Sequence, residues 1–367
     1  MKNGKCENLN RQTVRNGNIE ILRFVFCLLI IGLHYCEQFG YFGLLTFRGG
    51  YLGVEFFFAI TGVFLAKSIS EKKLVFSTNE MFLYSRKSII KKYLSILPFF
   101  VVSTILAFII KSICTSLKAS IVSITAIPMD LLMVNNYGLG GYTFTGILWY
   151  LSSLFFALIV LYPIILKFYD VYVKYYSVPV FLISMGLIMC RFNTFNVPNK
   201  YIGILNTGFL RAIAMISIGM FVYELSIVIS KCNFSRLCMT VTEVLLYLYT
   251  FLYMIFLQEI KELEIGMTTA LFSMLVALSI TLSKKSLFYG KFDNSFARFL
   301  GKSTMVLFMN HMYWIYNIDQ LLNIFNIRVS KNEKIMVLIF VIVISSIIVY
   351  YIGEQTKELL QKKNQKA

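Results

Sequence analysis

The sequence predicts an all-α protein, a polytopic helical bundle in a membrane, with about ten transmembrane helices and both termini in the cytoplasm. Of its 367 residues, 58% are hydrophobic and only 14% are charged, whereas soluble domains carry about 25% charged residues. The apolar residues form long runs, not amphipathic stripes. Runs of about 18 or more apolar residues are typical of membrane-spanning helices, the usual way for a chain without a closed barrel to cross a bilayer.

The runs predict the individual spans in order along the chain. The first holds Arg23 and His34 and lacks a small-residue cleavage site, so we interpret it as a span and not as a cleavable signal peptide. The spans form one membrane domain, 19–353, between a basic N-terminal segment, 1–18, and a basic tail, 354–367, each too short to fold alone. The ten expected spans are 19–36, 51–69, 93–111, 147–167, 176–191, 208–229, 238–257, 264–283, 303–320 and 335–353.

The net charge of +17 follows a topological pattern. Most Lys and Arg residues fall in the head, in the loop after the second span, in the loop before the ninth and in the tail, which the positive-inside rule assigns to the cytoplasm. The charge therefore does not indicate a nucleic-acid partner; it favours anionic lipid headgroups or an anionic cytosolic ligand. The seven cysteines lack metal-binding spacing, so we expect packing residues and no metal site.

Two ionisable residues share one face of the first span. Arg23 and His34 are eleven positions apart, which is three helical turns plus about 20°, and roughly 16 Å along the axis. Because ionisable groups are costly in lipid, this face is expected to point into the bundle or a water-filled cavity. Two alternatives stay open: Arg23 snorkels to the inner headgroups, and His34 is a hydrogen-bonded interfacial histidine.

The second span, "GGYLGVEFFFAITGVFLAKS", places Glu55 near the depth of His34. We expect its carboxylate to orient the imidazole of His34, with a position at the headgroup level as the alternative. Glycines in and before this span are expected to allow close helix approach or a broken helix. They are Gly49, Gly50, Gly53 and Gly62.

The first two spans resemble the membrane-bound acyltransferase type 3 family. The family pattern of Arg-Asn, an acidic-x-Leu-Arg run, ten residues and His is matched by Arg15, Asn16, Glu20, Leu22, Arg23 and His34. The second-span pattern is matched by "GVEFFFAITGVFL", with Thr61 where the family usually has Ser. In the basic loop, "KKYLSILP" keeps Lys91, Lys92 and Pro98 but has Ser95 where Arg is common.

Two later segments extend this resemblance over residues 15 to 353. "LWYLSSLFFALIVLYP" is similar to a family segment and carries Trp149. "FLGKSTMVLFMNHMYWIY" is similar to the family's last motif and carries Gly301, Thr304, Phe308 and His311. The resemblance favours a functional role for His311; a histidine hydrogen-bonded between helices is the alternative.

The resemblance implies acyl transfer across a bacterial plasma membrane. The donor would be cytosolic acyl-CoA, most often acetyl-CoA, and the acceptor a sugar hydroxyl of an extracytoplasmic or lipid-linked polysaccharide. Coenzyme A is polyanionic, so we expect Arg23, Arg86, Lys87, Lys91 and Lys92 to bind it. His34 would deprotonate the acceptor or form a transient acyl adduct, with Glu55 and His311 as the other catalytic candidates.

Two residues that begin their spans on the outer side are candidates for acceptor binding. Trp149 would stack on a sugar or serve as an interfacial anchor. Arg211 would bind substrate, pair with a carboxylate or snorkel.

Two other functions are also consistent with buried Arg and His residues. One is a transporter or flippase of lipid-linked saccharides, and the other is a non-catalytic membrane sensor. The chain shows no inverted repeat, so the sequence favours the enzyme.

Overall fold

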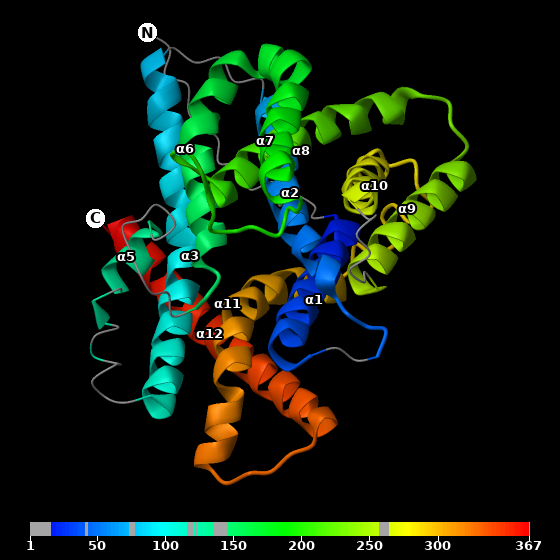
Figure 1. The fold of residues 1–367 in the computed structure, drawn as a ribbon. Helices are drawn as coiled ribbons and strands as arrows, with labels where there is room; N and C mark the ends of the chain where they lie inside the picture. The colour runs from blue at the N-terminus through cyan, green and yellow to red at the C-terminus, as the bar shows by residue number, and fades with distance from the viewer. Residues whose placement is uncertain are drawn as a thin grey trace.

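The computed structural model describes residues 16–40, 43–72, 78–115, 121, 124–125, 127–134, 145–256 and 264–366. It is a helical bundle with a single two-stranded hairpin in this part of the chain (Figure 1). The hairpin pairs β1 (Tyr201–Ile202) with β2 (Leu205–Asn206). The main helices are α1 (Gly17–Phe39), α2 (Leu52–Lys72), α3 (Thr78–Cys114), α6 (Leu148–Val171), α7 (Ser177–Phe192), α8 (Thr207–Lys231), α9 (Arg236–Phe256), α10 (Glu264–Leu282), α11 (Ser295–Ile324) and α12 (Lys331–Lys366), with short pieces η1 (Arg48–Tyr51), α5 (Ile127–Leu132) and η3 (Tyr172–Tyr176).

The all-α prediction is confirmed, and each of the ten expected spans coincides with one of the main helices. Within the described residues, seven helical segments are long and apolar enough to cross a membrane: 17–39, 48–71, 79–114, 148–192, 207–231, 236–256 and 331–360. The fourth segment joins α6 to α7 through the π-helical η3 and has non-helical φ/ψ angles at Phe168. The chain bends over at this point (Figure 1), as two separate spans require. That all ten helices cross the membrane stays a prediction.

Helix α2 lies at the centre of the bundle, with 72% of its apolar window buried. It packs directly on the backbone of α8, because a Cβ atom at Gly62 would overlap the carbonyl of Ile216 and one at Gly219 would overlap that of Ala59. Glycine at these positions lets two helices approach without intervening side chains. The predicted close approach is confirmed for Gly62 and also for Gly49, Gly50 and Gly53, whose added Cβ atoms would meet neighbouring elements within 2.9 Å.

Helices α1 and α11 pack alongside each other in parallel. Glu20 lies against Gly301, the thiol of Cys27 contacts the carbonyl of Thr304, and the backbone N–H of Gly17 donates to Asp293 over 2.6 Å. This register continues to the histidines, so His34 and His311 lie at one depth.

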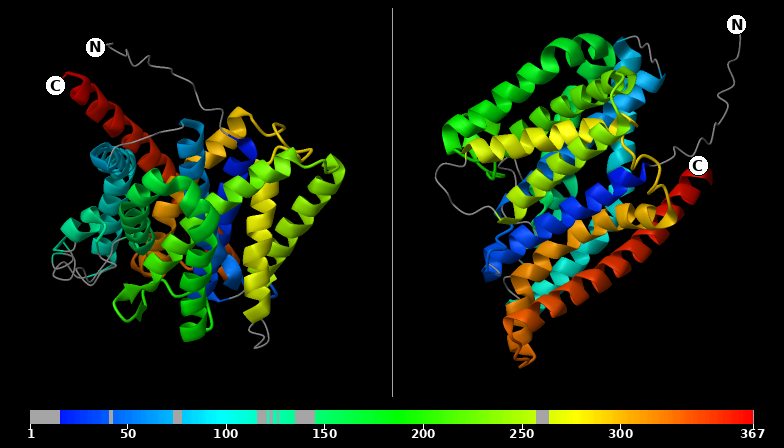
Figure 2. Two further views of the ribbon diagram at one scale, coloured as in Figure 1. Left: turned by 90° about the horizontal axis from the view of Figure 1, so that it is seen from above. Right: turned by 90° about the vertical axis from the view of Figure 1, so that its right-hand side faces the viewer.

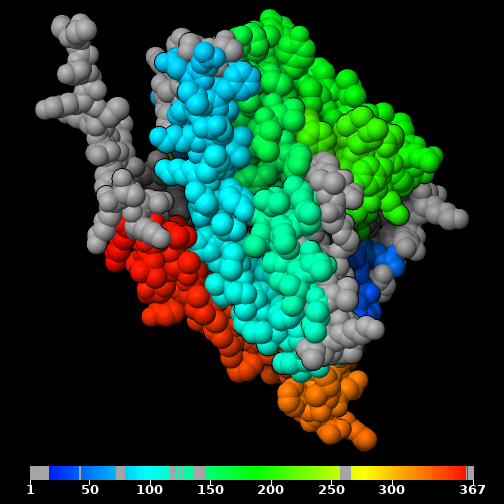
Figure 3. All heavy atoms as spheres, turned by 90° about the vertical axis from the view of Figure 1, so that its left-hand side faces the viewer, coloured from blue at the N-terminus to red at the C-terminus, as the bar shows by residue number. Residues whose placement is uncertain are grey.

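Helices α3 and α12 are much longer than a bilayer requires. With 37 and 36 residues, each is about 55 Å long, against a hydrocarbon core of about 30 Å. They lie together on one face of the molecule (Figure 3). Helix α12 continues to Lys366, so residues 354–366 of the predicted tail are helical. Of the predicted N-terminal segment 1–18, residues 1–15 lie outside the described part, and Gly17 already begins α1.

The start of α1 and the end of α12 lie on the same side of the bundle (Figure 2). This arrangement agrees with an even number of crossings between them. The cytoplasmic assignment of that side rests on the distribution of Lys and Arg and stays a prediction. All six cysteines in the described residues are free, and Cys27 and Cys36 are buried, as expected for packing residues.

Candidate active site

Two stacked histidines form the centre of the site. The imidazole rings of His34 on α1 and His311 on α11 lie 5.5 Å apart between centroids, with 27° between their planes. His311 is fully buried, whereas the side chain of His34 is 24% exposed. The chain's two histidines, 277 positions apart by their numbers, are thus brought together by the parallel packing of α1 and α11.

The two imidazoles have different partners. Nδ1 of His34 lies 2.9 Å from Oε2 of Glu37 on the same helix. Nδ1 of His311 donates to the backbone carbonyl of Leu307 over 3.3 Å, which leaves its Nε2 as the acceptor nitrogen. This buried Nε2 has no hydrogen-bond partner among the described residues.

Glu55 is not the partner of His34, and this expectation was wrong. Its two carboxylate oxygens accept bonds from Nε and Nη2 of Arg211, over 2.6 and 2.7 Å, and both side chains are fully buried between α2 and α8. The physical reason is depth: Phe26, about two helical turns before His34 on α1, stacks on Phe56, the neighbour of Glu55, so Glu55 and His34 lie at different depths. The glycine contacts also bring α8 onto α2, which places the guanidinium of Arg211 beside the carboxylate. Of the alternatives for Arg211, the carboxylate partner is the one that the structure shows.

Trp149 lies beside this ion pair. The guanidinium carbon of Arg211 is 5.0 Å from the centre of the indole ring, so one face of the ring is engaged in a cation–π contact. The third guanidinium nitrogen, Nη1, is buried and has no hydrogen-bond partner within the described part of the chain. The structure thus joins Glu55, Arg211 and Trp149 into one cluster, separate from the His34–Glu37 pair.

Arg23 lies three turns from His34 on α1 and points into the bundle. Its Nη1 donates to Oε2 of Glu20 over 2.8 Å, and its side chain is 25% exposed. It lies within electrostatic range of Lys92 on α3 and Tyr150 on α6. These neighbours from other helices show that the shared face of Arg23 and His34 is directed towards the interior, as the sequence predicts.

Aromatic rings connect the level of Arg23 with the histidines. Tyr150 lies 5.4 Å from Phe308, and Phe308 lies 5.6 Å from His311, measured between ring centroids. Phe57 on α2 closes the same cluster, 6.0 Å from Phe308. Phe57 and Phe308 are only partly buried, so they border open space and are not sealed in the core.

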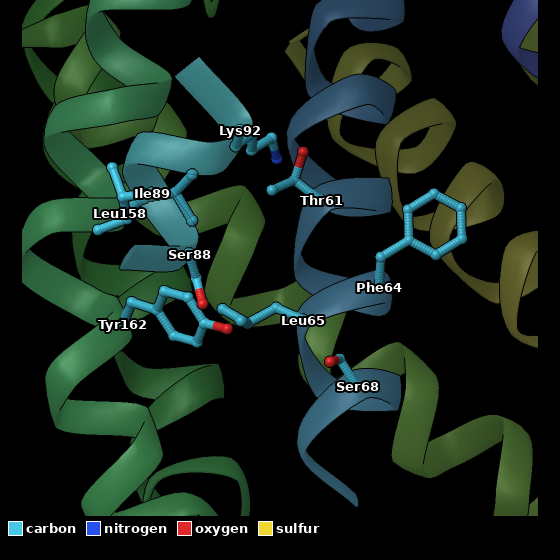
Figure 4. Close-up of a pocket in the computed structure, with 9 residues that line it drawn as sticks. All are labelled: Thr61, Phe64, Leu65, Ser68, Ser88, Ile89, Lys92, Leu158 and Tyr162. Carbon is cyan, nitrogen blue, oxygen red and sulfur yellow. The ribbon is translucent and has the colours of Figure 1, made fainter. Parts of the chain in front are cut away.

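A cavity of about 190 Å³ opens below this aromatic cluster, between α2, α3 and α6. Ser88 and Tyr162 point towards each other across it, and Lys92 lies at the same end as Thr61 (Figure 4). Thr61 is one helical turn from Phe57 on α2, about 6 Å along the axis. Of the four loop cations predicted to bind a donor, Lys92 lines the cavity, whereas Arg86, Lys87 and Lys91 are exposed on α3.

A buried polar network fixes α11 behind the histidines. The side-chain oxygen of Asn310 accepts bonds from Ser103 on α3, over 2.9 Å, and from Tyr313, over 3.0 Å. Its amide donates to Ser346 on α12 over 3.1 Å. Satisfied buried networks rigidify a core, so Asn310 holds the next residue, His311, in a defined position.

Sequence reasoning missed Glu37 as the partner of His34 and the network around Asn310. The spacing of Glu37, three residues after His34, is a helical-face signal that predicts such a contact. The network was not predictable in this way, because two of the three partners of Asn310, Ser103 on α3 and Ser346 on α12, are more than 30 residues away along the chain.

A family model described as an acyltransferase domain matches residues 16–354, which is nearly the whole chain. This chain belongs to the acyltransferase type 3 family. No curated protein and no solved structure matches it. The match begins at the N-cap of α1 and ends within α12, so it includes every helix that contributes to the histidine pair, the Glu55–Arg211 pair and the cavity.

The protein is therefore an acyltransferase in a multi-pass helical membrane fold. Membership of this family supports an enzyme and not the transporter or the sensor that were the alternatives from the sequence. Three of the family motifs recognised in the sequence supply residues of the histidine pair, the buried ion pair and the cavity. The first-span motif supplies Arg23 and His34, the last motif supplies Phe308 and His311, and the second-span motif supplies Glu55 and Thr61.

Proposed function

We propose that this acyltransferase moves an acyl group, most simply acetyl, from cytosolic acyl-CoA to a sugar hydroxyl on the outer side of a bacterial plasma membrane. The acceptor would belong to an extracytoplasmic or lipid-linked polysaccharide of the cell envelope. One observation carries the proposal: a single face of α2 runs from a cavity to the histidine pair. That face carries Ser68, Phe64 and Thr61 in the cavity lining and then Phe57 in the aromatic cluster.

The donor would enter through the cavity between α2, α3 and α6. Its lining combines apolar walls with hydroxyl groups from Thr61, Ser68, Ser88 and Tyr162. Such a lining suits the polar end of coenzyme A, whose ribose hydroxyls and phosphates need hydrogen-bond partners. Lys92 and Arg23 supply positive charge at the deep end, and the exposed Arg86, Lys87 and Lys91 on α3 supply it on the surface.

The thioester would then pass the aromatic cluster and reach the imidazoles. The distance along α1 from Arg23 to His34 is roughly 16 Å, which an extended pantetheine arm covers. Phe57, Tyr150 and Phe308 would exclude water around it and so protect the thioester from hydrolysis.

The chemistry would be general-base catalysis. An imidazole nitrogen takes the proton of the acceptor hydroxyl while its oxygen attacks the thioester carbonyl carbon. The carbon–sulfur bond then breaks, and the departing thiolate of coenzyme A takes that proton from the imidazole. The acceptor side would lie near Trp149 and Arg211, where the buried Nη1 is free to donate to a hydroxyl or ring oxygen.

The first test is turnover of radiolabelled acetyl-CoA by the purified protein in nanodiscs, with wild type beside His34→Ala. We expect transfer or slow hydrolysis of the acetyl group by the wild type and its loss in the variant. The reaction should be supplied with a bacterial surface-glycan extract as acceptor. If neither protein binds or consumes acetyl-CoA or longer acyl-CoA donors, the proposed donor is wrong.

A second experiment tests the entry route. In Ser88→Trp an indole fills the cavity, so we expect the KM for acetyl-CoA to rise or turnover to stop. Ser95→Trp is the matched control, since Ser95 lies on the same helix but is exposed and outside the cavity lining. Equal kinetics for the two variants would exclude this cavity as the donor path.

A further inference from the structure

Glu37 forms a carboxylate–imidazole pair that no family motif in the sequence includes. It lies on α1 three residues after His34, and its Oε2 is 2.9 Å from Nδ1 of His34. The pair is accessible, since the side chains are 24% and 47% exposed. Two residues at this helical spacing face the same side, so α1 alone sets the geometry.

A carboxylate in this position determines what the imidazole can do. It accepts the Nδ1–H bond, which fixes the tautomer and leaves Nε2 with a free lone pair for a proton. It also stabilises the positive charge that the ring acquires when Nε2 takes that proton. These are the two properties that a general base needs.

His311 lacks both advantages. Its Nδ1 donates to the neutral carbonyl of Leu307 and has no carboxylate partner among the described residues, and the ring is fully buried. A buried charge without a counter-ion is costly. The two rings are also only 5.5 Å apart, so a charge on one opposes a charge on the other. Two charges on this pair are therefore unfavourable, and the carboxylate of Glu37 favours placing a single positive charge on His34.

We propose that Glu37 is the positioning residue of the base: it orients His34, so that His34 and not His311 takes the acceptor's proton. This inference rests on the proposed acyl transfer. The acceptor O–H bond breaks and its proton moves to Nε2 of His34, while the acceptor oxygen bonds to the thioester carbon. The carbon–sulfur bond then breaks, and the proton passes from Nε2 to the thiolate of coenzyme A. His311 remains neutral and packs against the ring of His34.

The test compares the steady-state kinetics of Glu37→Gln, Glu37→Asp and Asp319→Asn with those of the wild type in nanodiscs. Glu37→Gln keeps a hydrogen-bonding group of the same size but removes the charge. We expect its kcat to fall roughly ten- to hundredfold, the range found when the hydrogen-bond partner of a metal-bound histidine is replaced. Its KM for acetyl-CoA should stay unchanged, since Glu37 lies away from the donor cavity. Glu37→Asp should recover part of the lost kcat.

Asp319→Asn is the control, because Asp319 is a 49% exposed carboxylate that pairs with Lys334. It should leave kcat unchanged. Thermal unfolding should show all three variants folded, since an exposed ion pair contributes little to stability.

Three results would overturn the inference. They are a kcat for Glu37→Gln within twofold of wild type, an effect confined to KM, and an equal loss in Asp319→Asn. An active wild type with any of these leaves the proposed function intact and removes the role of Glu37. A wild type that consumes no acyl-CoA removes the proposed function itself.

Discussion

The buried ion pair between Glu55 and Arg211 offers the sharpest prediction about stability. Both side chains are fully buried, and two hydrogen bonds of 2.6 and 2.7 Å join them. Either single substitution, Glu55→Leu or Arg211→Met, leaves one charge without its partner between α2 and α8. Such a loss costs about 3–5 kcal/mol of the free energy of unfolding. The double variant leaves no charge, so its loss should be close to zero and far below the sum of about 6–10 kcal/mol.

The assay is reversible unfolding in mixed detergent and SDS, followed by circular dichroism, for the wild type, both single variants and the double variant. The coupling energy of the cycle measures the pair. We expect several kcal/mol of coupling. Losses that add in the double variant, or single losses below about 1 kcal/mol, the range of exposed pairs, would refute the reasoning.

Two further predictions use matched variants. Lys92→Met should raise the KM for acetyl-CoA roughly tenfold, as expected for the loss of one charge-assisted hydrogen bond, with little change in kcat. Lys302→Met removes an exposed cation on α11 that has no part in the proposed donor path, so it should change KM less than twofold, and equal effects would contradict the assignment. Gly62→Ala places a Cβ atom against the backbone of Ile216 and should cost about 1–3 kcal/mol of unfolding free energy. Gly186→Ala meets open space on α7 and should cost nothing, so equal losses would show that the α2–α8 contact tolerates a methyl group.

The helices were predictable from the sequence because apolar length alone requires them. Every expected span coincides with a helix. The errors concern polar helix ends, where hydropathy is uninformative. The expected span omitted the first eight residues of α11, "SFARFLGK", because Arg298 and Lys302 lower the hydropathy of these turns. The expected last span likewise ended at residue 353, because the part of α12 after it is charged, although the helix continues through it.

The site was predictable only where its geometry lies within one helix. The common face of Arg23 and His34 follows from helical periodicity, and the structure shows both residues directed into the bundle. The partner of Glu55 did not follow, because it depends on which helix packs against α2. Depth in the membrane suggested His34, whereas the contact of α8 with Gly62 selects Arg211.

The charged residues of α1 and α2 have different kinds of partner, and this difference distinguishes residues that act on a ligand from residues that hold the helices together. Arg23 and His34 each pair with a glutamate three residues away on their own helix, Glu20 and Glu37, and all of these contacts are local. Local pairs leave the side chains about a quarter exposed and able to meet a ligand. Glu55 and Arg211 instead join two helices and are fully buried. A group that exchanges protons or binds a phosphate needs a local pair that leaves it partly exposed. A group that holds α2 against α8 needs a buried pair between the two helices. On this argument Glu55 stabilises the walls of the site, and the chemistry lies along the face of α1.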